Sequence, residues 1–302
     1  MKSFVRALSA SSRRTYTSAR RLFELWCEEN SRLHLPADPF TVCSYIAHLA
    51  TADTKYGRVH SVGTIEHALS AISYFHREHG FTDPTRNPMV IGLMEGVRRD
   101  QIGRQPDVKV PMLAADLRRI LKAYGRPTRP KDVRNIAGLL VHFCGGFRAQ
   151  ELVAITVDDV VFDGEILRVH VPTRGSAELS PVLIKPERNY SAAQALRQWL
   201  ELTGIREGAI FRAVDRHANV KCGLSREAWG YIIKACCKRA GLDSRQFSAH
   251  SLRVGHIRQA QVNGVSDQAI RLQTGHASIQ AIARFRDLMN ADSGGSSGHL
   301  GL

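Results

Sequence analysis

Two histidines and an arginine near the C-terminal end of the chain have types and spacing suited to binding a phosphate group. The chain contains His250-Ser-Leu-Arg253, and His276 follows Thr274-Gly. Imidazole and guanidinium groups donate hydrogen bonds to phosphate oxygens, and a guanidinium does so through a planar fork. Where such a site would need a nucleophile, nine residues after His276, the chain has Phe285. The stretch predicts a phosphate site without a reactive oxygen.

Earlier charged residues suit the same chemistry. Arg148 and Glu151 lie three residues apart, so a helix would present them on one face and the carboxylate could orient the cation. Arg174 and Lys185 lie beyond a predicted strand hairpin. A single arginine is most often a solvated surface charge, and a single histidine is more often packed or capping than functional. Together they supply the cations that charge developing on a phosphate requires.

This order and spacing resemble the tyrosine recombinase (phage integrase) family, and more closely its Cre-like members. Each matching motif is weak alone, but they stand in register over nearly the whole chain. The motifs are Trp26-Cys-Glu28 with Leu35-Pro-Ala-Asp-Pro39, Tyr74-Phe-His-Arg-Glu-His-Gly80, Gly146-Phe-Arg148-Ala-Gln-Glu151, His250-Ser-Leu-Arg253-Val-Gly255, and Gly264-Val-Ser before Gly275-His276. The resemblance implies site-specific DNA recombination by transesterification through a 3′-phosphotyrosyl intermediate, with no metal, ATP or other cofactor.

The resemblance also implies a role for each residue of the site. Arg148 and Arg253 are expected to receive the charge that builds on the non-bridging phosphate oxygens. His250 is the expected general base for the attacking hydroxyl, because imidazole titrates near neutral pH. His276 is expected to hydrogen-bond a phosphate oxygen, and Glu151 is expected to orient these cations.

Two positions depart from the family pattern. The family places a lysine on the hairpin to protonate the 5′-oxygen leaving group, and Arg174 aligns with that loop. Arginine gives up its proton far less readily, so Lys185 at the end of the next strand is the second candidate. At the position of the tyrosine nucleophile the chain has Phe285, and no tyrosine follows Tyr231. Without a phenolic oxygen no phosphotyrosyl bond can form there.

Three explanations of Phe285 stay open at this point. The chain is an active recombinase changed from Tyr to Phe, which arrests the reaction before cleavage, or it is a natural family member that only binds or synapses DNA. In the third explanation the register differs, and Phe285 forms an ordinary apolar helix face with Ile282 and Met289. Restoring a tyrosine and testing for a covalent DNA adduct separates an active recombinase from a binding factor.

Short helices are expected to carry these motifs in the N-terminal part. Apolar residues at helical spacing predict a helix from Arg13, a second after Thr41, a third capped by Thr64 and a last one over about residues 88–99. Prolines separate them. This predicts a helical core-binding (SAM-like) bundle as an N-terminal core-DNA-binding domain over residues 1–105. The segment 103–111, with two prolines and no apolar period, predicts an extended linker.

A catalytic domain over residues 106–302 should position the phosphate site. A hairpin at Asp163-Gly164 and a third strand over 181–185 predict a small antiparallel sheet. Everything after the third strand is predicted to be helical, over residues 192–202, 226–239, 250–261, 267–273 and 278–288. The expected fold is therefore mainly α, with an α-rich tyrosine-recombinase domain that carries the small sheet.

The composition points to a polyanionic partner. The 302 residues include 42 Lys and Arg against 28 Asp and Glu, a net charge of +14, and nucleic acid is the commonest partner of such a protein. No apolar run approaches the roughly 20 residues of a membrane span, and the N-terminus lacks the features of a secretory signal. The six cysteines have no CxxC spacing, which argues against a zinc site or disulfides. We expect a cytoplasmic, nucleoid-associated protein.

Double-stranded DNA carrying a specific recombination site is the expected partner, and two basic domains could close around it. The family acts as tetramers on two DNA sites, so self-association is expected as well. Arginines on the predicted helices are the candidates for phosphate and base contacts. They are Arg13, Arg14, Arg20, Arg77, Arg86, Arg98, Arg99 and Arg258.

Overall fold

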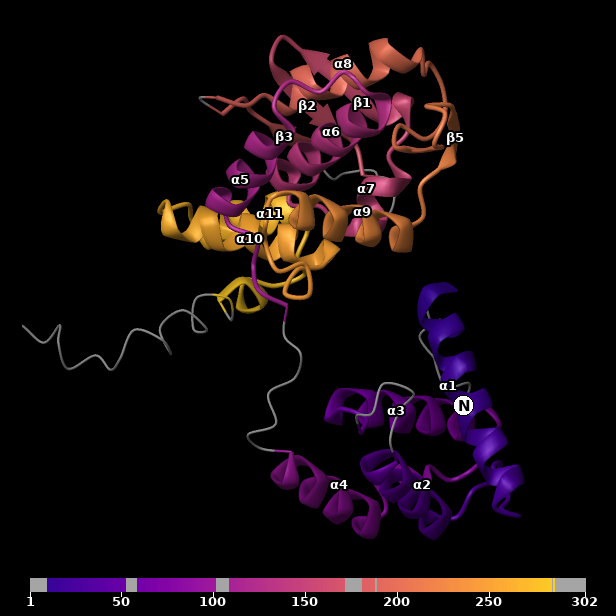
Figure 1. Cartoon of the computed structure of the whole chain (residues 1–302). Helices are drawn as coiled ribbons and strands as arrows, with labels where there is room; N and C mark the ends of the chain where they lie inside the picture. Colours follow the sequence, from indigo (N-terminus) through magenta and orange to yellow (C-terminus); the bar gives the residue numbers. More distant parts are fainter. Residues whose placement is uncertain are drawn as a thin grey trace, which may run out of the picture. The chain divides into compact units, whose positions relative to one another are not determined.

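The computed structural model describes residues 10–52, 59–101, 109–171, 181–187, 189–283 and 285. The chain divides into two compact units, Met1–Asp107 and Val108–Leu302. The described residues are mainly helical with small antiparallel sheets (Figure 1), which confirms the predicted fold class. None of the helices described is both long and apolar enough to span a bilayer.

Four α-helices form the N-terminal unit around one apolar core. They are α1 (Ala10–Glu29), α2 (Pro39–Thr51), α3 (Val62–Glu78) and α4 (Pro88–Asp100), and the short 3-10 helix η1 (Pro84–Arg86) precedes α4. Apolar faces spaced three and four residues apart meet in a core that includes Phe23, Ile46, Ile65 and Met94. The four predicted helices are therefore present.

The starts of two of these helices differ from the prediction. Asp38 caps α2 and Ser61 caps α3, and each side chain accepts the backbone N–H of the residue three positions later. Short oxygen-bearing side chains are suited to this position because they satisfy an N–H that has no partner within the helix. Thr41 and Thr64 were predicted to lie at these starts, but they lie in the first turns and provide the capped N–H groups.

The C-terminal unit packs helices around a three-stranded antiparallel sheet. The sheet has the order β1 (Val160–Asp163), β2 (Ile166–Val169), β3 (Val182–Ile184), and Leu167 lies opposite Ile184. The predicted hairpin and third strand are confirmed. Helices α5 (Ala114–Tyr124), α6 (Pro130–Gly145) and α7 (Ala149–Ala154) and the 3-10 helix η2 (Val157–Asp159) precede the sheet. After it come α8 (Ala192–Thr203), α9 (Arg226–Arg239), α10 (Ala249–Val262) and α11 (Asp267–Thr274).

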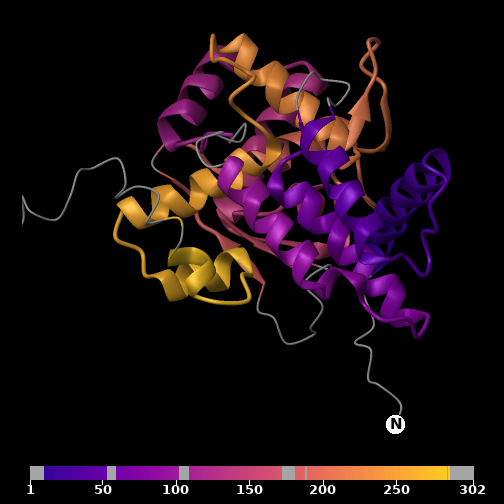
Figure 2. The ribbon, with the colours of Figure 1, turned by 90° about the horizontal axis from the view of Figure 1, so that it is seen from below.

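A second small hairpin contradicts the prediction that everything after β3 is helical. Strands β4 (Arg212–Val214) and β5 (Val220–Gly223) pair antiparallel between α8 and α9 (Figure 2). Asp215 organises the turn, because its Oδ1 accepts the backbone N–H groups of His217 and Asn219. The segment between them has no Asn-Gly or Asp-Gly pair like the Asp163-Gly164 turn of the first hairpin, which is why the sequence did not reveal them.

A glycine turn between α6 and α7 positions the site. Gly146 has φ +61, in the left-handed region that glycine adopts without strain, and it ends α6. A Cβ built on Gly146 would lie 2.9 Å from atoms of both His256 and Thr274. The chain can therefore pass between α10 and the end of α11 only with a glycine here, and Arg148 follows at the start of α7.

Candidate phosphate-binding site

Arg253 is the most enclosed charged group of the site. Its side chain is only 1% exposed, on the first turns of α10. Nη1 donates to the carbonyl of Gly146 and Nη2 to the carbonyl of Thr274, each at 2.7 Å. A buried guanidinium needs such acceptors because its desolvation is costly. These bonds fix the guanidinium between the α6–α7 turn and the end of α11.

Arg148 and Arg253 share one carboxylate. Glu151 is buried, and its Oε1 accepts from Arg148 Nη1 at 2.6 Å, while its Oε2 lies 3.7 Å from Arg253 Nη1. The same carboxylate accepts the backbone N–H of Arg148 at 2.7 Å, which caps α7. Arg148 itself remains 48% exposed. One guanidinium is thus buried, and the second is open to an incoming anion.

His250 lies in the first turn of α10, three residues before Arg253. The residue as a whole is exposed, yet partial burial of the ring and the positive charges of Arg253 and Arg148 lower its pKa. The lowered pKa favours the neutral imidazole at neutral pH, which is the form a general base requires.

His276 and Phe285 complete the cluster. Arg253 Nη2 lies 3.3 Å from both ring nitrogens of His276, and the hydroxyl of Thr274 lies 2.6 Å from its Nδ1. The ring of Phe285 meets the ring of His276 edge to face, with centroids 6.3 Å apart. Phe285 also packs against a small cluster of Ile257, Ile270 and Ile282. The ring at the nucleophile position is therefore both part of an apolar face and adjacent to the cations.

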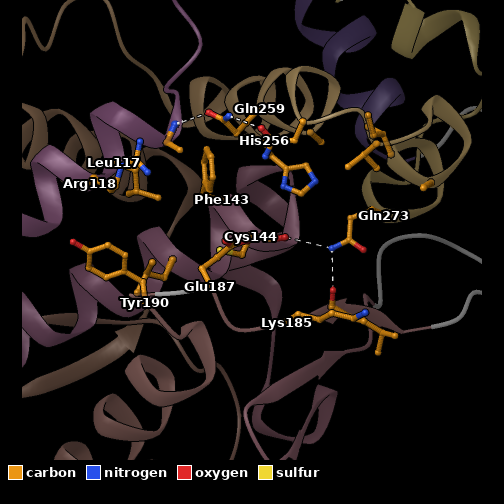
Figure 3. Close-up of a pocket in the computed structure, with 18 of the residues that line it drawn as sticks. Leu117, Arg118, Phe143, Cys144, Lys185, Glu187, Tyr190, His256, Gln259 and Gln273 are labelled. Carbon is orange, nitrogen blue, oxygen red and sulfur yellow. Dashed lines mark hydrogen bonds between the residues drawn. The ribbon is translucent and has the colours of Figure 1, made fainter.

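The structure describes only one of the two candidates for the lysine role. Arg174 lies outside the described residues. Lys185 is exposed just after β3, on the wall of a cavity of about 650 Å³ that is also lined by Phe143, His256 and Gln273 (Figure 3). The residues that line the cavity do not include Arg148, His250, Arg253 or His276. The lining of this cavity is therefore distinct from the cation cluster.

Sequence analysis missed a buried histidine that supports the Arg148 turn. His142 is fully buried, and burial lowers its pKa to about 3, so it is neutral. Trp229 Nε1 donates to His142 Nδ1 at 2.9 Å, which leaves Nε2–H to donate to the carbonyl of Phe147 at 3.0 Å. This carbonyl belongs to the residue before Arg148. A histidine inside an apolar helix pattern, six residues before Arg148, was the available signal.

Exposure divides the arginines predicted to contact DNA. Arg20 and Arg258 are half-buried, and Arg20 is also paired with Glu24 at 3.3 Å. Arg98 is exposed, but it donates to Glu66 at 2.8 Å, so a phosphate would compete with that carboxylate. The other members, all exposed, are Arg13, Arg14, Arg77, Arg86 and Arg99.

The described side chains contain no group of three or more His, Cys, Asp or Glu arranged to hold a metal ion. Guanidinium and imidazole groups can bind a phosphodiester, polarise its phosphorus and stabilise the added charge of a pentacoordinate state.

Comparison with known proteins agrees with this geometry. The model of the phage integrase family matches residues 112–291. An integrase/recombinase xerD homolog of Selenomonas ruminantium is 30% identical over 272 residues, which cover 87% of this chain and 77% of that protein. Recombinase cre of Escherichia phage P1 is 23% identical over 291 residues, which cover 91% of this chain and 83% of that protein.

Solved structures show the same fold at lower sequence identity. A Tyr-to-Phe variant of the Tn1549 transposon integrase, in complex with transposon right end DNA, gives a TM-score of 0.66 at 14% identity and covers 96% of each chain. A lambda integrase dimer bound to a core site gives 0.60 at 15% identity, over 94% of this chain and 90% of that chain. The fold, the family model and the Selenomonas relative agree, and the chain belongs to the phage integrase family, the tyrosine recombinases.

Proposed function

We propose that this chain holds the scissile phosphate of a specific DNA recombination site and that, with a tyrosine at position 285, it breaks and rejoins DNA by transesterification. The observation that carries the proposal is the pair of guanidinium groups of Arg148 and Arg253 on one buried carboxylate, with the ring of Phe285 against His276. A phenol replacing that ring would stand beside the phosphate that the arginines bind.

Each side chain of the site then has a task. Arg148 and Arg253 bind the two non-bridging oxygens, and their charge stabilises the transition state. His250, held neutral by its lowered pKa, accepts the proton of the attacking hydroxyl. His276 donates to a phosphate oxygen. Lys185 or Arg174 protonates the leaving 5′-oxygen, and Lys185 is the better acid of the two.

With Phe285 the site binds and synapses DNA without cutting it. Phenylalanine keeps the aromatic ring and its packing against Ile257, Ile270 and Ile282, so the change leaves the phosphate pocket in place. The N-terminal unit, 1–107, would serve as the core-DNA-binding domain and 108–302 as the catalytic domain. We expect the chain to form tetramers on two DNA sites, since one similar solved structure is a lambda integrase tetramer bound to a Holliday junction. We expect this DNA-binding protein to be in the cytoplasm, at the nucleoid.

The deciding experiment restores the nucleophile. The Phe285 chain first selects its target from a random duplex library, because it can bind without cleaving. The Phe285→Tyr variant is then incubated with a nicked suicide form of the selected site, and covalent adducts are resolved on a denaturing gel. We expect an adduct with the Phe285→Tyr variant, none with the parent chain, and a loss on the order of 100-fold when Arg148→Ala is added to the variant.

The same adduct assay tests two things separately: whether Arg174 impairs protonation of the leaving group, and whether the chain is a recombinase. If Phe285→Tyr binds the selected site but gives no adduct, the Arg174→Lys change is added to it. An adduct that appears only then identifies Arg174 as the second defect. No adduct in either variant contradicts the recombinase assignment and leaves a DNA-binding factor.

DNA binding itself is tested by its salt dependence. Eight or so phosphate contacts would weaken binding by roughly 10³-fold or more between 50 and 200 mM salt. Binding of the selected duplex, measured by fluorescence anisotropy at several salt concentrations, should therefore fall steeply. A nearly constant affinity would contradict a protein that binds mainly through phosphates on both units.

A further inference from the structure

Thr274, the last residue of α11, makes two short contacts through one hydroxyl. The residue is fully buried. Its Oγ1 lies 2.6 Å from the carbonyl oxygen of Ile270 and 2.6 Å from Nδ1 of His276. Its own carbonyl accepts from Arg253 Nη2 at 2.7 Å. One residue therefore contacts both the histidine and the buried arginine of the phosphate site.

The Thr274 hydroxyl has only one hydrogen, so it can donate to only one of its two neighbours, the carbonyl of Ile270 or Nδ1 of His276. The carbonyl of Ile270 can only accept, so the Thr274 hydroxyl satisfies it by donating. The oxygen then has only lone pairs to offer His276, and Nδ1 must be the donor. The opposite assignment would place the two oxygen acceptors 2.6 Å apart with no hydrogen between them. Both contacts are satisfied only if His276 carries a hydrogen on Nδ1.

The neighbouring arginine does not decide between the ring nitrogens. Arg253 Nη2 is 3.3 Å from Nδ1 and also 3.3 Å from Nε2. A donor aligned with the lone pair of one nitrogen would be clearly nearer to that nitrogen. The guanidinium therefore contacts the ring between the two nitrogens, and Thr274 is the residue that distinguishes them.

We propose that Thr274 is a positioning residue that fixes the ring of His276 and keeps its hydrogen on Nδ1. A neutral His276 then has no hydrogen on Nε2, and Nε2 gains one only when the ring becomes an imidazolium. A threonine that bonds only to the carbonyl four residues earlier is common in helices and would have no such effect. The second contact at 2.6 Å sets Thr274 apart from that ordinary case.

The end of α11 is held in place, so the hydroxyl stays beside His276. The adjacent side chain, Gln273, donates through Nε2 to the carbonyl of Cys144 at 3.3 Å and to that of Leu183 at 3.2 Å, which ties α11 to α6 and β3 (Figure 3). Gly275 then turns the chain with φ +65, and its N–H closes on the carbonyl of Arg271 at 2.8 Å. The methyl group of Thr274 faces Gly146, where a Cβ would lie 2.9 Å from it.

The consequence for DNA rests on the proposed function. With its hydrogen held on Nδ1, His276 donates to a phosphate oxygen through Nε2 only as a cation, so it would supply charge as well as a hydrogen bond. Among the described residues, the charged and titratable side chains of the surrounding elements are Arg148 and Glu151 at α7, His250, Arg253, His256 and Arg258 on α10, and Asp267 and Arg271 on α11. Glu151 and the phosphate favour the cation, and Arg148 and Arg253 oppose it.

The position of the hydrogen on the His276 ring can be measured in the full chain without DNA. The parent, Thr274→Ser and Thr274→Val are labelled with ¹⁵N-histidine, and long-range ¹H–¹⁵N spectra of the imidazoles are recorded near pH 8, where an ordinary histidine is neutral. His276→Gln identifies the His276 signals. We expect the Nδ1–H tautomer in the parent and in Thr274→Ser, and a mixture with Nε2–H in Thr274→Val. Parent signals of the Nε2–H tautomer, or an unchanged tautomer in Thr274→Val, would overturn the proposal.

The pH dependence of the rate of adduct formation tests the role of Thr274 in the reaction. In the Phe285→Tyr background, the rate of adduct formation should fall about tenfold per pH unit above the titration of the required imidazolium. Thr274→Val should flatten this fall, because a neutral ring can then carry its hydrogen on Nε2, and Thr274→Ser should restore it. Superimposable pH profiles for Thr274→Val and the parent would contradict the positioning role. If no adduct forms in any variant, the proposed function fails, and the NMR result still decides the proton position.

Discussion

Arg148 and Arg253 lie in one region of this site and Phe285 lies in another, and different kinds of contact stabilise the two regions. Arg148 and Arg253 are held by hydrogen bonds to backbone and carboxylate groups, next to the main core with its buried residues Phe147 and Trp229. Among the described residues, Phe285 makes apolar and ring contacts, with a small separate cluster of Ile257, Ile270 and Ile282 and with His276. The first region holds its two arginines through directional polar contacts. The second holds its aromatic ring through packing alone among the contacts described.

The largest expected effect comes from removing the buried cation. Arg253→Ala removes the donor to the carbonyls of Gly146 and Thr274 and the buried cation 3.7 Å from Glu151, so we expect a loss of about 3–5 kcal/mol in the free energy of unfolding. The matched control is Arg148→Ala, whose side chain is 48% exposed, and this should cost under about 1 kcal/mol. Urea denaturation followed by fluorescence measures both, with Trp26→Phe so that the signal reports the C-terminal unit. Equal losses of unfolding free energy in Arg253→Ala and Arg148→Ala would contradict the prediction that the buried arginine contributes more to stability.

A smaller and local effect is expected in the second region. Ile282→Ala removes a fully buried side chain from the small cluster, which should cost about 2–4 kcal/mol. Because this cluster is separate from the main core, the loss should appear as faster hydrogen exchange over residues 280–285, with α6 and α8 unchanged. Ile279→Ala, at a side chain 45% exposed, is the control and should change little. A comparable loss of protection in α6 would show that the two regions unfold as one.

Acid should weaken the first region rather than the second, and the amount for each buried histidine is the smallest of the three expected effects. Burial lowers the pKa of His142 to about 3 and that of His256 to about 4, so the unfolded chain binds protons that the folded chain does not. Stability is then fully present above the unfolded value of about 6.5 and is lost as the pH falls below it. Each histidine should cost about 2 kcal/mol between pH 6.5 and 5.

The pH effect is checked with the same fluorescence-detected urea denaturation. His256→Gln keeps a polar side chain that does not titrate, so its stability should change less between pH 6.5 and 5 than that of the parent. The small cluster of Ile257, Ile270 and Ile282 has no titratable member, and protection of residues 280–285 should therefore change less with pH than protection of α6. Parallel curves for the parent and His256→Gln would contradict a neutral, buried His256.

The sequence by itself determined the helices, the first sheet and the residue types of the site. Apolar periodicity is a local signal, and α9 was predicted with the bounds that the structure shows. The pairing of Arg148 with Glu151 followed from their three-residue spacing, since a helix places such residues on one face. The β4–β5 hairpin was missed because its turn lacks the Asp-Gly signal that marked the first hairpin.

Only the tertiary structure decided how the site is held together. The local sequence does not reveal the contacts of His142, Gly146 and Thr274, because their partners Trp229 on α9 and Arg253 on α10 lie far from them along the chain. Hydrogen bonds between distant segments depend on how the helices pack, and packing is not encoded in any short window. The position of Phe285 beside His276 is also a tertiary fact. The sequence showed that residue 285 carries no reactive oxygen, and the fold showed that its ring lies against His276.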